Sequence, residues 1–368
     1  MAKAKMKVFH VLTDKNIGGA GRWLLNYLNH YDRETFQVSV VLPKGSLLIP
    51  EVEKLEVPVI VMAEMADKSL DYKAIAPLQK LFIDEAPDVV HTHASLTARM
   101  AAKFAKVYLI VHTKHCMEST KGGYTKKRVK KIINKTFSHK IIGVSEAVSE
   151  SMAYGGVDIK QIVTICNGIT PLQPISKEER AEVLKSYGGD PSKKAVGIVA
   201  RLEAVKDHKT FLLGAKEVLS KEDNVCFYVI GDGSLREKLV AQTQKLGIEQ
   251  NVIFTGFISD VERMEAALDI NVITSKEEAL CLSIIETMSL GIPSVGTNAG
   301  GIKEVIADGK NGYLVPVGNY KALAEKIELV LHSPRSKYSG HAKHLVERNF
   351  QAKYMTKEIE RLYLEGRT

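Results

Sequence analysis

Two glutamates stand eight positions apart in the segment SKEEALCLSIIETMSLGIP at 275–293, which has the pattern of a strand end, a short loop and a helix. Glu278 lies in the loop, and Glu286 lies one turn into a helix that we expect to begin near Leu282 and to end at Gly291. Carboxylates in these places can hold the vicinal hydroxyls of a ribose or a hexose. Glu286 also falls in an apolar run, where a buried carboxylate needs a polar partner. The alternative is that both are ordinary surface charges.

Backbone N–H groups at two predicted helix starts can bind anions. The first N–H groups of a helix have no partner within it, so those of Leu282 and Ser283 can hold phosphate oxygens. Near the N-terminus, the loop TDKNIGGAGRW opens another helix, and Gly18, Gly19 and Gly21 would let its backbone approach an anion closely. Any tight turn can also require glycine, so this loop by itself leaves both interpretations open. Its spacing is not that of the dinucleotide fingerprint.

Arg201 and Lys206 stand just past an apolar run, in the segment ARLEAVKDHKT at 200–210. Two such cations on a loop and helix start can clamp a diphosphate, the arginine by its planar fork and the lysine as a point charge. A surface ion pair with Glu203 or Asp207 is the competing interpretation. The chain contains no Asp-x-Asp triplet, so we expect no metal site and no other cofactor.

Short apolar, β-branched runs alternate with helix-patterned segments along the whole chain. The runs are continuous, which is typical of parallel strands buried on both faces. We expect strands at 7–13, 37–43, 57–63, 88–93, 108–113, 140–145 and 161–168, and then at 193–202, 225–233, 251–257, 269–275, 293–299 and 312–319. The alternation predicts two doubly wound α/β domains that bind ligands at the carboxyl ends of their strands. We place them at 1–170 and 171–350, with an interdomain connection over 167–192 and a last helix within 351–368.

The composition is that of an ordinary globular protein. The chain has 368 residues, of which 45% are hydrophobic and 26% charged, which excludes wholesale disorder and collagen-like repeats. The net charge of +8 favours an anionic partner. The four cysteines show no metal-ligand spacing. Neither a signal peptide nor an apolar run long enough to cross a bilayer is visible, so we expect a cytoplasmic protein, at most peripheral at the inner face of the plasma membrane.

The excess positive charge lies in one segment, 119–140, which contains eight Lys and Arg and no Asp or Glu. Val129, Ile132, Ile133 and Phe137 recur at helical spacing, so one face of a helix here can pack. The cations expected on the other faces include Lys126, Lys127, Lys130 and Lys131. Such a helix suits an anionic membrane surface or a membrane-bound acceptor, and a merely solvated face is the alternative. Nucleic acid is not expected, because there is little aromatic interleaving.

Taken together, these segments resemble the retaining glycosyltransferases of family 4. The stretch 278–286 resembles the family's E-x7-E motif. The other motifs follow in order over nearly the whole chain: GGA, NGIT (167–170), ARLEAVKDH, VIGDGSLREKL (229–239), NVIFTGFISD (251–260) and GIPSVGTNAGGIKEVI (291–306). Two residues depart from the pattern, Cys281 where many members have Gly or Pro, and Gly21 where an acidic residue is commoner. The resemblance implies the GT-B fold, in which two Rossmann-like doubly wound domains face a central cleft and the C-terminal helix returns to the first domain.

The resemblance also implies roles for the polar residues. Arg201 and Lys206 would hold the donor diphosphate and neutralise the charge of the leaving group. Glu286 would bind the ribose hydroxyls, and Glu278 would contact the hydroxyls of the transferred sugar.

Two further elements take implied roles. The N–H groups around Leu282 and Ser283 would contact the distal phosphate or the sugar. His115, just after the strand expected at 108–113, matches the histidine that the family places near the reacting sugar, with His112 as the second choice.

The function expected on this basis is transfer of a sugar from a nucleoside diphosphate sugar, which we expect to be UDP-linked, to an acceptor hydroxyl. The transfer would retain the configuration at the anomeric carbon. The acceptor would be a lipid-linked or cell-envelope glycan. Two other functions remain open: a nucleotide-sugar epimerase of similar fold, and a non-catalytic subunit that binds a nucleotide sugar.

Overall fold

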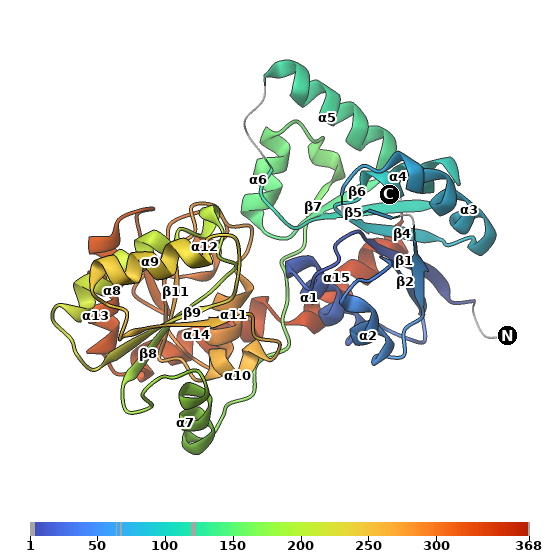
Figure 1. Ribbon diagram of the computed structural model, residues 1–368. Helices are drawn as coiled ribbons and strands as arrows, with labels where there is room; N and C mark the ends of the chain where they lie inside the picture. The colour runs from blue at the N-terminus through green and yellow to red at the C-terminus, as the bar shows by residue number, and fades with distance from the viewer. Residues whose placement is uncertain (1–3, 64, 67, 119–122, 367–368) are drawn as a thin grey trace. The chain divides into compact units, whose positions relative to one another are not determined.

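The computed structural model describes residues 4–63, 65–66, 68–118 and 123–366. The chain forms two compact units (Figure 1). Unit 1 comprises Met1–Ile169 and Gln351–Thr368, and unit 2 comprises Thr170–Phe350. The last segment of the chain therefore belongs to the same unit as the first.

Unit 1 is built on a seven-stranded parallel sheet with the order β3-β2-β1-β4-β5-β6-β7. The strands are β1 (Met6–Leu12), β2 (Phe36–Pro43), β3 (Val59–Met62), β4 (Val89–His93), β5 (Leu109–Lys114), β6 (Lys140–Gly143) and β7 (Ile162–Thr164). All residues of β4, in the middle of the sheet, are buried. Helices cover both faces of the sheet, so its strands are buried on both sides. This explains why the apolar runs in the sequence are continuous.

The helices of unit 1 follow the strands in the expected alternation. They are α1 (Gly19–Leu28), α2 (Leu48–Glu53), α3 (Ile75–Glu85), α4 (Leu96–Phe104), α5 (Tyr124–Phe137), α6 (Glu146–Tyr154) and α15 (Ala352–Glu365). Local chemistry fixes some of their starts. Ser145, which we expected within a strand, instead accepts a hydrogen bond from the backbone of Val148 and caps α6, because a serine hydroxyl can satisfy a free N–H there.

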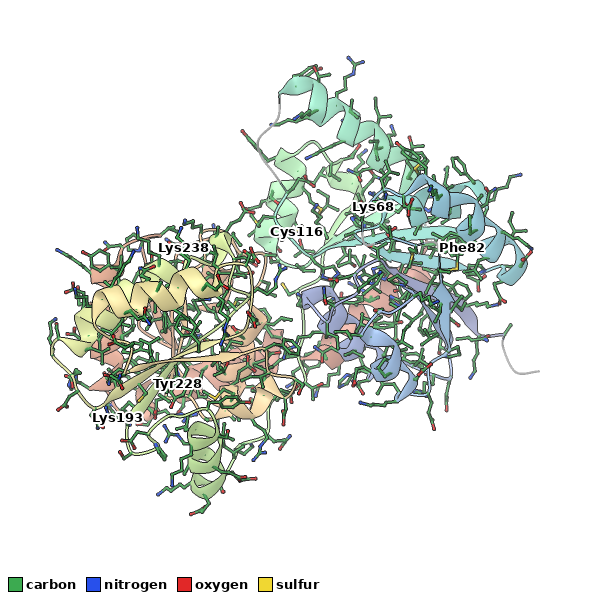
Figure 2. All side chains as sticks on the ribbon, viewed as in Figure 1. Lys68, Phe82, Cys116, Lys193, Tyr228 and Lys238 are labelled. Atoms are coloured by element: carbon green, nitrogen blue, oxygen red, sulfur yellow. The ribbon has the colours of Figure 1, made fainter. Side chains whose placement is uncertain are left out.

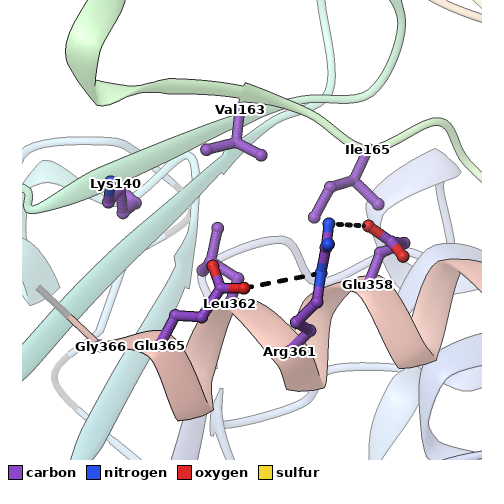
Figure 3. A pocket seen from close by; sticks show the side chains of 8 residues that line it. All are labelled: Lys140, Val163, Ile165, Glu358, Arg361, Leu362, Glu365 and Gly366. Atoms are coloured by element: carbon purple, nitrogen blue, oxygen red, sulfur yellow. Dashed lines mark hydrogen bonds and ion pairs between the residues drawn. The ribbon is translucent and has the colours of Figure 1, made fainter. Parts of the chain in front are cut away.

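The C-terminal helix α15 completes the core of unit 1. Ile359 and Tyr363 are fully buried with residues of α1 and of the sheet, and the backbone N–H of Ala352 donates to Ile169 O at 2.9 Å. Figure 3 shows the far end of α15 beside the β6–β7 edge. A cavity of about 70 Å³ lies there, and Arg361, which pairs with glutamates of its own helix, is at its rim.

Unit 2 is built on a six-stranded parallel sheet with the order β10-β9-β8-β11-β12-β13. The strands are β8 (Lys194–Val199), β9 (Val225–Ile230), β10 (Val252–Gly256), β11 (Ile270–Ile273), β12 (Ser294–Thr297) and β13 (Gly312–Val315). Sequential strands run outward from β8 on one side and from β11 on the other. The carboxyl ends of β8 and β11 therefore form a topological switch point, where open α/β sheets bind their ligands.

The helices of unit 2 lie on both faces of its sheet. They are α7 (Lys177–Ser186), α8 (His208–Leu219), α9 (Arg236–Leu246), α10 (Val261–Ala266), α11 (Leu282–Ser289), α12 (Ile302–Val305), α13 (Tyr320–Leu331) and α14 (Ser336–Asn349). The stretch 167–192 is thus more than a connection, because α7 forms within it. A capping box between Ser176 and Glu179 starts that helix.

Each unit has its own buried aromatic residues (Figure 2). Phe82 of α3 is buried in unit 1, and Tyr228 of β9 is buried in unit 2. Among the labelled cations, Lys193 and Lys238 project outward from unit 2. Every run that we expected to be a strand overlaps one, although most of the strands are shorter than the runs.

Candidate functional site

Two loops meet at the switch point of unit 2. Because β8 and β11 are paired neighbours, the loops that follow them lie together. The Thr274 hydroxyl donates to Lys206 O at 2.9 Å and to Asp207 O at 3.0 Å, and the backbone N–H of Lys276 donates to Val205 O at 2.8 Å. These bonds bring residues some 70 positions apart in the sequence into one fixed arrangement.

Lys206 and Glu278 form an ion pair at the centre of this arrangement. Lys206 Nζ lies 2.5 Å from Glu278 Oε2, and both side chains are more than four-fifths buried. Ser275 also donates to Glu278 Oε2, at 3.1 Å. Both contacts use Oε2, and within the described residues no hydrogen bond is made by Oε1. The lysine is thus held by one carboxylate oxygen while the other remains available.

Arg201 lies on the same loop as Lys206 but is not engaged. Its side chain is exposed and makes no hydrogen bond or ion pair with any residue that the structure describes. Lys206 does not form the ion pair with Glu203 or Asp207 that the competing interpretation required. Glu203 accepts hydrogen bonds from Ser234, and Asp207 Oδ1 lies 3.8 Å from Lys276 Nζ. The interpretation in which Arg201 and Lys206 form surface ion pairs with Glu203 or Asp207 is therefore wrong.

Two consecutive glycines hold the backbone of the Glu278 loop. Gly301 N donates to Glu278 O at 2.9 Å. A Cβ on Gly300 would lie 2.0 Å from Glu278 O, and one on Gly301 would lie 2.0 Å from Ala279 O. Gly300 also has a positive φ of 50°. Both positions require glycine, because a side chain would push the Glu278 loop away.

Helix α11 begins directly after this loop, at Leu282 as expected. Its N-cap residue, Cys281, makes no side-chain capping bond, so the first N–H groups are not satisfied in that way. Asn271 of β11 anchors the helix by donating to Ser283 O at 3.0 Å. Glu286 is buried, with 3% of its surface exposed, which excludes the interpretation of this residue as ordinary surface charge.

Cys281 is the one departure from the motif that the structure places in this loop. It is buried, and its Sγ lies 3.3 Å from Ser283 Oγ. Burial, together with the nearby charge of Glu278, raises the pKa of the Cys281 thiol to about 12. The side chain is therefore an uncharged, small packing residue at ordinary pH.

The remaining predicted site residues belong to unit 1. Gly18 is the N-cap of α1, and Gly19 is its first residue. A Cβ on Gly19 would meet nothing within 4 Å, so packing does not require glycine there. His115 follows β5 directly, and its Nε2 lies 2.8 Å from His93 Nδ1. His112, the second choice, is bonded to Thr92 within the sheet.

The basic helix α5 forms as expected, but the prediction that its apolar face packs against the protein is wrong in part. No residue of α5 is buried. Val129 is 49% and Ile132 is 58% exposed, so apolar side chains that we expected to pack face solvent. The four predicted lysines also differ among themselves. Lys130 pairs with Glu118 at 2.5 Å and Lys127 lies 3.8 Å from the centre of the Tyr154 ring, whereas Lys126 and Lys131 are exposed.

Two family models match the chain. "Glycosyltransferase Family 4" matches residues 17–171, and "Glycosyl transferases group 1" matches residues 179–350. The chain belongs to the glycosyltransferases of family 4. Among the described residues of this glycosyltransferase, no helix has the length and apolarity that a membrane span needs.

Curated relatives and solved structures agree with this assignment. The glycosyltransferase is 27% identical over 341 residues to the UDP-Gal:alpha-D-GlcNAc-diphosphoundecaprenol alpha-1,3-galactosyltransferase of Escherichia coli, with 86% of this chain and 85% of that enzyme covered. It is 26% identical to the N-acetyl-alpha-D-glucosaminyl L-malate synthase of Bacillus anthracis, over 76% of this chain and 74% of that enzyme. The crystal structure of Anabaena HepE in complex with UDP-glucose superimposes with a TM-score of 0.85 at 22% identity, covering 98% and 100% of the two chains. The fold is thus GT-B, with two Rossmann-like parallel-sheet domains.

Sequence reasoning missed some of the groups that shape the site. Ser275, which bonds Glu278, was not singled out, although a polar residue at the end of a buried strand next to a functional loop is a usable signal. Tyr363 and His10, which lie beside His93 and His91 in the core, gave no signal of their own because they are distant in sequence from every motif.

Proposed function

We propose that this glycosyltransferase takes its sugar from a UDP-sugar and transfers it to an acceptor hydroxyl with retention at the anomeric carbon. The observation that carries the proposal is the Lys206–Glu278 contact, with the unpaired Arg201 on the same loop, at the switch point of unit 2. The relatives support it. The E. coli enzyme is named for a UDP-Gal donor, and HepE was solved with UDP and with UDP-glucose.

Arg201 and Lys206 would bind the diphosphate in this proposal. A diphosphate brings negative charge that grows on the leaving group as the glycosidic bond breaks, and fixed cations stabilise that charge. Lys206 is already oriented by Glu278, so little reorganisation is needed when the donor arrives. Arg201 is unpaired and can turn its guanidinium to the phosphate oxygens. Charge neutralisation is thereby assigned to side chains, with no requirement for a divalent cation.

The two glutamates would bind the hydroxyls of the donor. Glu278 can accept a hydroxyl of the transferred sugar at Oε1 while Oε2 keeps Lys206 and Ser275. Glu286, buried on the first turns of α11, would bind the ribose hydroxyls. The free N–H groups at Leu282 and Ser283 would bind the distal phosphate or the sugar.

The reaction itself would need no nucleophile from the protein. The bond between the anomeric carbon and the phosphate oxygen breaks, and the acceptor oxygen bonds the same face of that carbon. The departing diphosphate takes the proton of the acceptor hydroxyl. Unit 1 would supply the acceptor side, including the Gly18–Gly19 helix start and His115.

The acceptor is proposed to be lipid-linked or part of a cell-envelope glycan, reached from the cytoplasmic face of a membrane. The name of the E. coli relative describes a diphosphoundecaprenol acceptor. Helix α5 fits a surface of anionic lipid, because exposed apolar side chains stand among its exposed cations: Tyr124 is 80%, Val129 is 49% and Ile132 is 58% exposed. Each cation near such a surface contributes about 1 kcal/mol.

Calorimetric titration with UDP tests the diphosphate assignment. Arg201→Ala and Lys206→Ala should each weaken UDP binding about 10- to 100-fold, because each removes a charge-assisted contact. Lys209→Ala is the matched control, since Lys209 is an exposed cation of the same segment. Equal affinity in all four proteins would contradict the assignment of these cations to the diphosphate.

A further inference from the structure

Three hydroxyl groups are buried where β11 and β12 of unit 2 end. Thr274 and Ser275 directly follow β11, and Thr297 is the last residue of β12. Each of the three residues has at most 1% of its surface exposed. Removing a hydroxyl from water is unfavourable unless it forms hydrogen bonds. The partners of these three groups therefore indicate what their burial holds in place.

The Thr274 hydroxyl holds the turn that follows β8. A hydroxyl has a single proton, and Thr274 shares it between the backbone oxygens of Lys206 and Asp207, at 2.9 and 3.0 Å. Both oxygens belong to the turn that joins the short helix η3 (Ala204–Lys206) to α8. Thr274 thus ties the backbone that carries the Lys206 side chain to the end of β11.

The turn at Asp207 has a backbone conformation that needs such a restraint. Asp207 has a φ of 48°, in the left-handed region that residues other than glycine rarely adopt. Its side chain accepts from the Thr210 hydroxyl at 2.8 Å, and its carbonyl accepts from the Thr210 N–H at 2.9 Å. Those bonds are local to the start of α8, whereas the bonds of Thr274 connect the turn to the sheet. A strained turn persists only where its surroundings hold it.

The other two hydroxyls act on the Glu278 side of the site. Ser275 donates to Glu278 Oε2 at 3.1 Å, the same oxygen that binds Lys206. Thr297 donates to Ser275 O at 2.6 Å, so it fixes the backbone of Ser275 to the end of β12. The three hydroxyls therefore connect the loops after β8 and β11, and the last residue of β12, around the single contact between Lys206 and Glu278.

These bonds differ from those of an ordinary buried threonine. Thr243 of α9 is 2% exposed, and its hydroxyl donates to Val240 O at 2.7 Å, one turn back in the same helix. The hydroxyls of Thr274 and Thr297 instead bond residues 68 and 22 positions away. Loss of the Thr243 bond affects one helical turn, whereas loss of the other two frees a loop that carries a charged group of the site.

We propose that Thr274 and Thr297 are positioning residues, whose hydroxyls hold the loops after β8 and β11 so that the Lys206 ammonium stays on Glu278. This role rests on the proposed function, because it takes Lys206 and Glu278 to bind the donor. A cation that is already in place stabilises the charge developing on the leaving group without reorganisation. The two threonines themselves act only through Lys206 and Glu278.

Kinetics of UDP-sugar turnover test the role of the Thr274 hydroxyl. Thr274→Val keeps the shape of the side chain and removes the hydroxyl, whereas Thr274→Ser keeps the hydroxyl. In Thr274→Val we expect kcat to fall about tenfold while the donor KM stays within about twofold. A mobile ammonium still reaches the bound diphosphate, but it no longer stabilises the growing charge from a fixed position. Thr274→Ser should keep kcat within about twofold of the wild type.

Thr243→Val is the matched control for Thr274→Val. It removes one buried hydroxyl from the same unit, so the two valine variants should lose similar amounts of thermal stability. Only Thr274→Val should lower kcat, which a general loss of stability would not explain. Equal kcat in Thr274→Val and Thr274→Ser, or equal losses in Thr274→Val and Thr243→Val, would overturn the role of Thr274.

Thr297 provides an independent pair of variants, which keeps the proposal testable if Thr274→Val does not fold. Thr297→Val should lower kcat about threefold to tenfold, because it frees the backbone of Ser275 while the bonds of Thr274 remain. Thr297→Ser should restore most of that loss. Wild-type kcat in Thr297→Val would show that Thr297 has no positioning role, and wild-type kcat in both valine variants would overturn the whole inference.

NMR spectra of the lysine ammonium groups separate this inference from the proposed function, because they need no substrate. The Lys206 ammonium lies in a buried ion pair, so its protons exchange slowly with water and give a signal that Lys206→Arg assigns. The signal should persist in Thr274→Ser and in Thr243→Val, and should lose most of its intensity in Thr274→Val. An unchanged signal in Thr274→Val of an enzyme that turns over UDP-sugar would overturn the inference alone. A wild type that shows the signal but neither binds nor turns over any UDP-sugar would overturn the proposed function, and with it the catalytic consequence of the positioning.

Discussion

At the scale of single residues, the candidate site depends on contacts that fix the positions of its charged side chains. Glu278 fixes Lys206 with one carboxylate oxygen, and the backbone of Glu278 is itself fixed by Gly301. Desolvation offsets much of the attraction in an ion pair buried this far, so the contact adds little net stability. The arrangement keeps the ammonium in one place before any ligand is present.

Gly300→Ala is predicted to reduce activity without unfolding the protein. Its Cβ would lie 2.0 Å from Glu278 O at a residue with positive φ, so the Glu278 loop must move. If Glu278 acts as proposed, its displacement by about 1 Å can cost about a hundredfold in rate. Turnover of UDP-sugar and a thermal melt measure the two effects. Gly309→Ala is the control, because Gly309 also has a positive φ but nothing lies within 4 Å of its Cβ. Equal activity of the two variants would count against the role of this backbone contact.

At the scale of elements, the strands followed from their apolar runs, and the start of α11 followed from its flanking loop and its terminating Gly291. The pairing of Lys206 with Glu278 did not, because it joins side chains 72 residues apart, and only the order of β8 and β11 in the sheet brings them together. The periodicity of α5 was also insufficient to predict how its apolar face packs. It showed an apolar face, but the spacing of residues does not say whether that face meets the protein or the solvent.

Helix α5 is predicted to hold the protein on anionic membranes. Lys126→Glu combined with Lys131→Glu reverses two exposed cations, and should release the protein from vesicles that contain phosphatidylglycerol, because each reversal costs about 1–2 kcal/mol of attraction. Sedimentation with the vesicles measures the bound fraction. The matched control is Lys209→Glu with Lys216→Glu, which changes the same charge on exposed lysines of α8. Equal release by both pairs of substitutions, or failure of the wild type to bind the phosphatidylglycerol vesicles, would contradict the role of α5.

At the scale of the whole molecule, the division into two parallel-sheet domains followed from the repeated alternation of runs, whereas the core of unit 1 could not be fully anticipated. The histidines of β1, β4 and β5 are separated by some 20 to 80 residues and converge only through strand register. Tyr363 reaches them because the chain returns to unit 1 after unit 2. A last helix with no neighbour in its own half predicts such a return, but not the residue that it places in the core.

These buried histidines make a prediction about stability and pH. Burial lowers the pKa of His10 and His115 to about 3, and lowers those of His91, His93 and His112 well below the usual value. The unfolded chain binds protons near pH 6.5 and the folded chain does not, so stability is fully present above about pH 6.5 and is lost as the pH falls toward about 3. Each histidine contributes up to about 1.4 kcal/mol per pH unit in that window.

Urea unfolding at a series of pH values from about 7 to about 5 measures this loss. His93→Phe should lose less stability over that range than the wild type, because it has one fewer group to protonate on unfolding. A free energy of unfolding that is independent of pH in the wild type would show that the histidines are not held neutral by the fold.

Turnover of a panel of UDP-sugars by the purified enzyme, with the products followed by NMR, tests the central claim most directly. The wild type should hydrolyse or transfer at least one sugar, first releasing it as the anomer present in the donor, and a chelator such as EDTA should leave the rate unchanged. Glu278→Gln should reduce the rate about a hundredfold or more, while Glu277→Gln, a change at the exposed neighbouring residue, should leave it unaltered. Release of the opposite anomer would contradict retention, loss of activity with EDTA would contradict charge neutralisation by Arg201 and Lys206 alone, and equal rates for the two glutamine variants would contradict the site.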